Sequence, residues 1–297
     1  MNISGIFVID KPVGAPSQAA ITQLRRTFDL KRVGHCGTLD PLASGVLPVM
    51  LGTATRVCDL LMDHEKTYTA TIRLGLVTDS QDVTGEVLQT YEGALPSFEE
   101  FRDAAETFSG EIEQIPPMYS ALKKNGQKLV DLARKGVVIE REPRKVFIRS
   151  IRAYEEDGAY KLDVCCSRGT YIRTLCADIG EKLGCGACME QLRRTSVGRF
   201  DLSQAVSLEE LRAMTAEQAA EHVIPVEQVF SDLPALRLPA FFERLYRNGE
   251  RISLRKIGLH ALAGDRFRLY GEDGFYAIGE VREQDGEKKL CPGILFR

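Results

Sequence analysis

A regular alternation of side chains runs through residues 66–74. The apolar side chains fall on one face, at Tyr68, Ala70, Ile72 and Leu74. The polar ones fall on the other, at Thr67, Thr69, Thr71 and Arg73. A period of two is that of a β-strand and predicts one buried face. Such a strand needs neighbours to pair with and a layer to cover it, which restricts the fold.

Further strands and helices are predicted on both sides of this segment. Strands are expected at 5–9, 45–52, 146–155, 160–167 and 189–200. Helices are expected at 17–28, 53–62, 97–108 and 170–183, with Ser17 and Ser97 as N-caps. The order has no regular βαβ alternation, so we predict an α+β fold with a mixed, mostly antiparallel sheet and flanking helices.

The chain also contains a second, smaller unit by this interpretation. An acidic region around 213–227 resembles a boundary, and the turn Glu272-Asp273-Gly274 lies between two short β-rich runs. With 297 residues and 44% hydrophobic content, two units can each bury a core. We place them at residues 1–228 and 229–297.

Charge is sorted into blocks, although the net charge is only −3. Residues 78–114 hold ten Asp or Glu against one Arg, and residues 119–149 are strongly basic. Arg25, Arg26, Lys31 and Arg32 form another basic group. Such blocks fit either one positive face for phosphates or two ordinary solvated faces, and charge alone leaves both open.

The chain carries no signal for secretion or for a membrane. Its N-terminus lacks a basic region, and no apolar run is long enough for a spanning helix. Eight cysteines in a chain of this size do not imply a disulfide scaffold. We expect a cytoplasmic protein with reduced thiols and no membrane partner.

Metal and cofactor motifs are weak. Cys185 and Cys188 form one Cys-x-x-Cys pair, without the second pair of a zinc site or the context of a redox motif. No glycine pattern fits a phosphate or dinucleotide site. We therefore expect neither metal nor organic cofactor.

Asp40 stands in a loop shaped for a special conformation. Pro41 disfavours a helical backbone at Asp40, and Gly34 and Gly37 allow sharp turns before it. The carboxylate is thus held between regular elements. Taken alone, an Asp-Pro pair is more often ordinary turn chemistry.

Two other positions could complete a site. Arg173 follows a strand-to-helix junction, and an arginine beside Asp40 would stabilise the charged carboxylate. Tyr68 heads the apolar row of its strand, where it could stack on a base exposed in a cleft. The alternatives are a surface arginine and a tyrosine packed in the core.

Several segments together resemble one known family. Residues 34–47, Gly-His-x-Gly-Thr-Leu-Asp-Pro-x-Ala-Ser-Gly-x-Leu, are similar to the catalytic motif of the tRNA pseudouridine synthase B family. The runs at 5–12, 66–75, 115–123, 167–173 and 192–194 match its other motifs in order, over roughly residues 4–210. A set in this order is far more specific than any single motif.

The resemblance implies a fold and a reaction. Residues 1–228 would form a pseudouridine synthase catalytic domain with an RNA-gripping insertion at about 117–145, and 229–297 a PUA-like domain. The enzyme would convert the T-loop uridine at tRNA position 55 into pseudouridine without metal or cofactor. We expect a monomer that binds the T stem-loop of tRNA.

The resemblance also implies roles for individual residues. Asp40 would be the nucleophile, and Tyr68 would stack on the uracil and help remove its C5 proton. Arg173 would pair with Asp40. The remaining contacts with RNA would come from His35, Tyr171, Leu192, Lys123 and Lys124.

Three rival interpretations stay open. One is an RNA-binding protein without activity, which would not need Asp40, Tyr68 and Arg173 together. Another is a glycoside hydrolase, but that chemistry ordinarily needs a second carboxylate, and neither motif supplies one. The third is a synthase of the same family that acts on another RNA.

Overall fold

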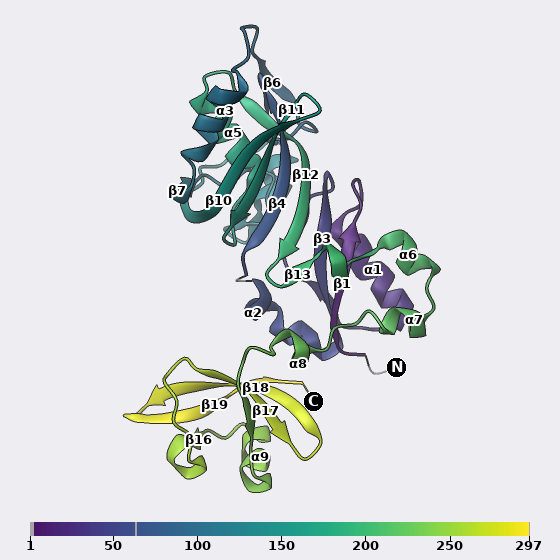
Figure 1. Cartoon of the computed structure of the whole chain (residues 1–297), viewed down its shortest axis with the longest axis vertical. Coiled ribbons are helices and arrows are strands. Elements are labelled where there is room, and N and C mark those ends of the chain that lie inside the picture. Colours follow the sequence, from purple (N-terminus) through teal and green to yellow (C-terminus); the bar gives the residue numbers. More distant parts are fainter. Residues whose placement is uncertain (1–2, 63, 297) are drawn as a thin grey trace.

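The computed structural model describes residues 3–62 and 64–296. The molecule is elongated, with a large mixed sheet at one end and a smaller β-rich unit at the other (Figure 1). Within the described residues, ten strands form the large sheet, whose main order is β14-β1-β3-β12-β4-β11-β10-β7. β2 pairs with β3 and β13 pairs with β12.

The strands of the large sheet are β1 (Gly5–Lys11), β2 (Val33–His35), β3 (Ala43–Leu51), β4 (Lys66–Leu74), β7 (Gly110–Gln114), β10 (Arg144–Glu156), β11 (Ala159–Cys166), β12 (Ala187–Val197), β13 (Phe200–Asp201) and β14 (Val206–Ser207). β1 runs parallel to β14, and β3 runs parallel to β12. The other pairs are antiparallel. The predicted α+β class with a mixed, mostly antiparallel sheet is confirmed.

One face of this sheet is covered by helices. These helices are α1 (Ser17–Phe28), α3 (Phe98–Glu106), α5 (Ile172–Lys182), α6 (Leu208–Ala213) and α7 (Ala216–Ala220). Three others, η1 (Gly52–Val57), α2 (Cys58–Met62) and α8 (Val226–Val229), pack against the opposite face of β1 and β3. Tyr68, Ala70 and Ile72 are buried in one continuous core with α1, α3 and α5. The apolar face predicted for residues 66–74 is therefore the inward face.

The two predicted N-caps have different outcomes. Ser97 caps α3 with a capping box, in which its hydroxyl accepts from the Glu100 amide. Ser17 does not cap α1, because Pro16 occupies the cap position. The prediction for Ser17 was wrong because its hydroxyl has a tertiary partner, Leu39, that the local sequence does not reveal.

The opposite face of β1 and β3 carries the smaller unit. This unit holds β15 (Ala235–Arg237), α9 (Ala240–Arg247), β16 (Ile252–Ser253), η3 (Leu254–Ile257), β17 (Arg266–Gly271), β18 (Gly274–Gln284) and β19 (Glu287–Leu295). Its strand order is β15-β17-β18-β19-β16, and the predicted turn at 272–274 joins β17 to β18. Phe275 and Ile278 pack in one cluster with Val8, Val46 and Val226. This apolar contact joins the two sheets.

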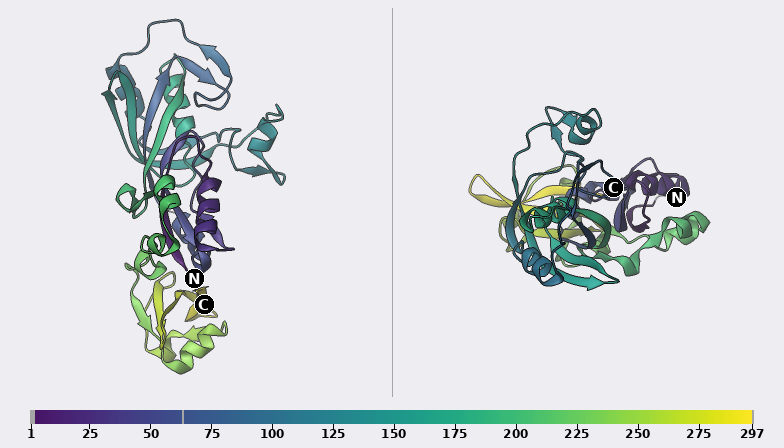
Figure 2. Two further views of the ribbon diagram at one scale, coloured as in Figure 1. Left: turned by 90° about the vertical axis from the view of Figure 1, so that its right-hand side faces the viewer. Right: turned by 90° about the horizontal axis from the view of Figure 1, so that it is seen from above.

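Residues 117–143 form an excursion from the large sheet. It contains the short strands β8 (Lys123–Lys124) and β9 (Gln127–Lys128) and the helix α4 (Leu129–Ala133). Figure 2 shows it projecting from the body of the molecule. A second hairpin, β5 (Leu76–Thr78) and β6 (Val87–Thr90), follows β4.

None of the helices in the described parts of the chain combines the length and apolar character of a transmembrane segment. All eight cysteines carry free thiols.

Candidate active site

The loop that carries Asp40 is held by hydrogen bonds from α1, from the connection between β1 and α1, and from β3. The Ser17 hydroxyl at the start of α1 accepts from the Leu39 amide (2.9 Å) and donates to the Leu39 carbonyl (2.8 Å). The amide of Gly14 donates to the Pro41 carbonyl at 2.8 Å. The Ala43 amide donates to the Asp40 carbonyl at 3.1 Å, so Asp40 is fixed just before β3. The sequence-based expectation of a shaped loop agrees with this geometry.

Lys11, at the end of β1, lies fully buried beneath the same loop. Its Nζ donates to the carbonyls of Pro12 (2.9 Å), Ala15 (2.6 Å) and Pro41 (3.4 Å). Burial lowers the pKa of Lys11 to about 8, and the nearby carboxylate of Asp40 opposes that shift.

Arg173 lies beside Asp40, although 133 positions separate them in the sequence. Its Nε is 3.0 Å from Asp40 Oδ2, with the Arg173 side chain buried and the Asp40 side chain 41% exposed. Nη1 donates to the Ser80 carbonyl (2.9 Å), and Nη2 donates to the Tyr119 carbonyl (2.8 Å). Asp82, also buried, places Oδ2 at 3.8 Å from Nη1. The guanidinium is therefore fixed on several sides, with one edge on the exposed carboxylate.

Asp40 and Arg173 open onto a cavity of about 450 Å³. The cavity is also lined by Tyr68, Tyr171 and Leu192, which the sequence had singled out. Other lining residues come from the Asp40 loop, from residues 119–130 of the excursion and from the junction at 167–172. Five predicted site residues thus meet in one place.

Tyr68 is buried and Tyr171 is partly buried. Burial raises the pKa of Tyr68, and the neighbouring charge of Arg194 opposes that rise. Burial also raises the pKa of Tyr171. The backbone of Tyr171 is clamped by Gln114, whose Oε1 accepts from the Tyr171 amide (3.0 Å) and whose Nε2 donates to the Tyr171 carbonyl (3.2 Å).

His35, Lys123 and Lys124 are not among the cavity residues. His35 ends β2, and its Nδ1 is buried without a hydrogen-bond partner. Burial lowers the pKa of His35. Lys123 and Lys124 line a separate hollow of the excursion, where Lys124 Nζ donates to the Glu140 carbonyl at 2.6 Å. These three residues lie outside the cavity that contains Asp40.

Four cations of the cavity were not predicted as site residues: Lys66, Lys128, Arg168 and Arg194. Lys66 donates to the carbonyls of Met62 (3.2 Å) and His64 (3.0 Å). Arg194 is fully buried on β12. The sequence carried one signal for Arg194, since it shares the inward face of its strand with Leu192.

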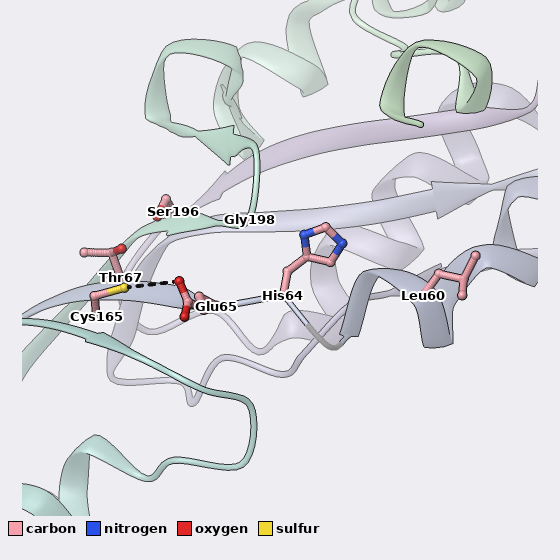
Figure 3. A pocket seen from close by; sticks show the side chains of 7 residues that line it. All are labelled: Leu60, His64, Glu65, Thr67, Cys165, Ser196 and Gly198. Carbon is pink, nitrogen blue, oxygen red and sulfur yellow. Dashed lines mark hydrogen bonds between the residues drawn. The ribbon is translucent and has the colours of Figure 1, made fainter. Parts of the chain in front are cut away.

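A second cavity, of about 480 Å³, lies on the other side of β4. Figure 3 shows His64, Glu65, Thr67 and Cys165 around it, with the Cys165 Sγ 4.0 Å from Glu65 Oε2. It contains none of the predicted site residues. Among residues 3–62 and 64–296, no group of three or more His, Cys, Asp or Glu is arranged to hold a metal ion.

Two family descriptions match the chain. Residues 25–172 match the N-terminal domain of the TruB family of pseudouridylate synthases. Residues 173–231 match the C-terminal domain of tRNA pseudouridylate synthase B. The two matches are contiguous and meet at Arg173.

Curated relatives resemble the chain over nearly its full length. tRNA pseudouridine synthase B of Pseudomonas fluorescens is 44% identical over 306 residues, covering 100% of this chain and 96% of the relative. The protein of the same name in Clostridium tetani is 39% identical over 283 residues, covering 95% and 97%.

Solved structures share the fold. A Cbf5–Nop10–Gar1 complex contains a chain with a TM-score of 0.72 and 27% identity, covering 99% of this chain and 85% of that one. The structure of an H/ACA RNP bound to a substrate RNA containing 2'-deoxyuridine gives a TM-score of 0.69 with 23% identity over 99% and 85% of the two chains. At that identity the second likeness concerns the fold alone.

Proposed function

The chain belongs to the TruB family of pseudouridylate synthases, and we propose that it is a tRNA pseudouridine synthase acting on the T-loop uridine at position 55. The enzyme is an isomerase, since pseudouridine has the same atoms as uridine. The observation that carries the assignment of the site is the carboxylate of Asp40, half-exposed in a cavity and 3.0 Å from the buried guanidinium of Arg173.

The reaction exchanges one bond for another. The N1–C1′ bond of uridine breaks, the uracil turns, a C5–C1′ bond forms, and the proton on C5 is lost while a ring nitrogen gains one. Asp40 acts as the nucleophile at the sugar. Two routes start from its carboxylate, attack at C1′ and promotion of a glycal-type intermediate. Both need a negative charge held in a fixed place, and Arg173 supplies the fixed countercharge.

The target base must leave its stack to reach Asp40. Extruding a base costs a few kcal/mol, and an apolar and aromatic receiving pocket offsets part of that cost. Tyr68 offers its ring to the uracil, and Tyr171 and Leu192 complete the walls of the cavity. The Tyr68 hydroxyl then takes part in removing the C5 proton.

The surrounding surface contacts the rest of the tRNA. RNA is recognised largely through its phosphates, its shape and its unstacked bases. Lys123 and Lys124 on the projecting excursion meet the backbone of the T stem-loop, and His35 packs against T-loop bases. We propose that the protein does this as a cytoplasmic monomer composed of a catalytic domain, residues 1–228, and a PUA-like domain, residues 229–297.

The test compares Asp40→Asn with the wild type. Tritium released from C5-labelled uridine in a T-stem-loop RNA reports turnover, and filter binding reports affinity. We expect Asp40→Asn to bind with a dissociation constant near normal and to release no tritium above background. Asp59→Asn, an exposed carboxylate outside the cavity, is the matched control. Release by Asp40→Asn at a near-normal rate would exclude Asp40 as the nucleophile.

Mapping of pseudouridine in treated tRNA by mass spectrometry tests the substrate. Product at position 55 alone supports the assignment. Product at another position would instead favour a synthase of the same family with a different target. The absence of any product, with intact RNA binding, would favour an RNA-binding protein without activity.

A further inference from the structure

We propose that Arg194 is a positioning residue of the reaction, whose buried guanidinium holds the phenol of Tyr68 in place against the loop that carries Asp40. This inference rests on the function proposed above. It concerns a buried side chain that lines the cavity and to which neither the sequence motifs nor the chemistry of Asp40 assigns a task.

The first support is where Arg194 stands in the sheet. It is directly opposite Tyr68 in the antiparallel pair β12–β4. It is also beside Gly45 in the parallel pair β12–β3. β12 is thus the strand that joins the element bearing Tyr68 to the element that follows Asp40, and Arg194 lies at the junction.

The second support is the set of partners of the guanidinium. Nε donates to the Val46 carbonyl at 2.7 Å, and Nη2 donates to the Gly37 carbonyl at 3.1 Å. Gly37 precedes Asp40 by three residues, and Val46 follows it by six. Arg194 therefore bridges both ends of the segment that carries the nucleophile.

The third support is the burial of the charge. Only 1% of Arg194 is exposed, and the two acceptors above are backbone carbonyls. Burying a cation costs free energy, and bonds to neutral carbonyls offset that cost less fully than a carboxylate would. Its neighbour Arg193 points the other way, 42% exposed, and pairs with Asp10 at 2.8 Å. The two adjacent arginines thus occupy opposite environments.

The chemistry of Tyr68 gives the buried charge a purpose. A phenol that accepts the C5 proton must do so as a phenolate, or pass its own proton on as it accepts. Burial opposes the phenolate, and the charge of Arg194 acts in the other direction. A fixed cation next to the hydroxyl also fixes the ring on which the uracil stacks.

The experiment is a double-mutant cycle between Arg194 and Tyr68, read by single-turnover tritium release. We expect Arg194→Gln to lower the rate at saturating RNA about 10- to 100-fold, with KM changed less than about threefold. In the Tyr68→Phe background, which lacks the hydroxyl, the same change should lower the rate less than about threefold. Equal losses in both backgrounds would overturn the proposal.

The pH profile and an isotope effect separate positioning from general damage. If Arg194 favours the phenolate, the rate of Arg194→Gln should reach its plateau at a higher pH than that of the wild type. Deuterium at C5 should slow the variant more than the wild type, because proton removal becomes limiting. An unshifted profile together with an unchanged isotope effect would contradict the proposal.

Two further variants keep the test decisive. Arg194→Lys retains the charge and should fall between wild type and Arg194→Gln, and it replaces the glutamine variant if that one fails to fold. Arg193→Gln, the adjacent arginine outside the cavity, is the control and should keep near-normal rates. If the wild type forms no pseudouridine, the proposed function fails. If it does, and Arg194→Lys behaves as Arg193→Gln, only the role of Arg194 fails.

Discussion

Replacing Arg173 by methionine should destabilise the protein as well as inactivate it. The methionine side chain keeps the volume of the aliphatic stem and removes every donor. The carbonyls of Ser80 and Tyr119 then lose the donors that now lie at 2.9 and 2.8 Å. The buried carboxylate of Asp82 loses its cation. Asp40 loses the same cation, but its carboxylate is exposed enough for water to take the place of the guanidinium.

The magnitude follows from these losses. A buried acceptor left without a donor costs about 1–3 kcal/mol. Breaking a buried charge pair by removing one partner costs about 3–5 kcal/mol in total, and the retained bonds from Ser80 and Thr84 to Asp82 Oδ1 favour the lower figure. For a domain of this size, 3–5 kcal/mol corresponds to a fall in Tm of roughly 6–20 °C.

Thermal and urea unfolding measure the effect directly. Arg168→Met is the matched control, because Arg168 lines the same cavity but is exposed, and it should change stability by about 0.5 kcal/mol or less. Arg173→Lys should recover part of the stability, yet lose about 100-fold in turnover, since an ammonium cannot reproduce the planar fork. If the free energies of unfolding of Arg173→Met and Arg168→Met lie within about 1 kcal/mol of each other, the buried bonds of Arg173 do not stabilise the fold to the extent expected.

Three further changes test other parts of the molecule. The double variant Lys123→Glu, Lys124→Glu should raise the dissociation constant for tRNA and make it less dependent on salt, with a smaller effect on turnover at saturation. An unchanged dissociation constant would refute the RNA contact. Burial lowers the pKa of His35, so the unfolded state binds a proton more readily than the folded state does, and the free energy of unfolding falls as pH drops below about 6.5. Calorimetry at roughly pH 7.5 and roughly pH 5.5 measures the resulting loss of Tm, which should be smaller in His35→Gln. Gly45→Ala should lower the free energy of unfolding by about 3 kcal/mol or more, because φ is +101° and the added Cβ would lie 2.1 Å from the Arg194 carbonyl oxygen. Gly14→Ala is the control, with φ +84° and open space around the Cβ, and should lower it by about 1–2 kcal/mol in the same urea titration.

Local patterns were sufficient for much of the fold. The alternation at 66–74 predicted the burial of Tyr68, Ala70 and Ile72, whereas Leu74 is only partly buried and Thr71, on the polar face, is buried as well. The turn predicted at Glu272-Asp273-Gly274 joins β17 to β18, and Gly274 adopts a positive φ there. Such features depend on neighbours within a few positions, which is the range over which sequence rules operate.

Long-range contacts could not be obtained in this way. Nothing near Arg173 in the sequence indicates that it meets Asp40, and the expectation came from the ordered set of motifs. Ser17 illustrates the same limit. Serine is a residue type that favours the N-cap, but the Ser17 hydroxyl bonds to the backbone of Leu39 instead of capping α1. A side chain with two possible partners is assigned by tertiary packing, which the local sequence does not contain.

Inward-facing cations offer a local signal for this kind of site. Lys11 on β1, Lys66 on β4 and Arg194 on β12 each share the inward face of their strand with apolar core residues. Each donates to backbone carbonyls, and Lys66 and Arg194 line the cavity that contains Asp40. A strand that alternates correctly and then places a cation on its buried face breaks the pattern that stability favours. Lys11 and Arg194 donate to the loop that carries Asp40, and Lys66 lines the cavity beside it, so the three breaks indicate this cavity independently of any motif.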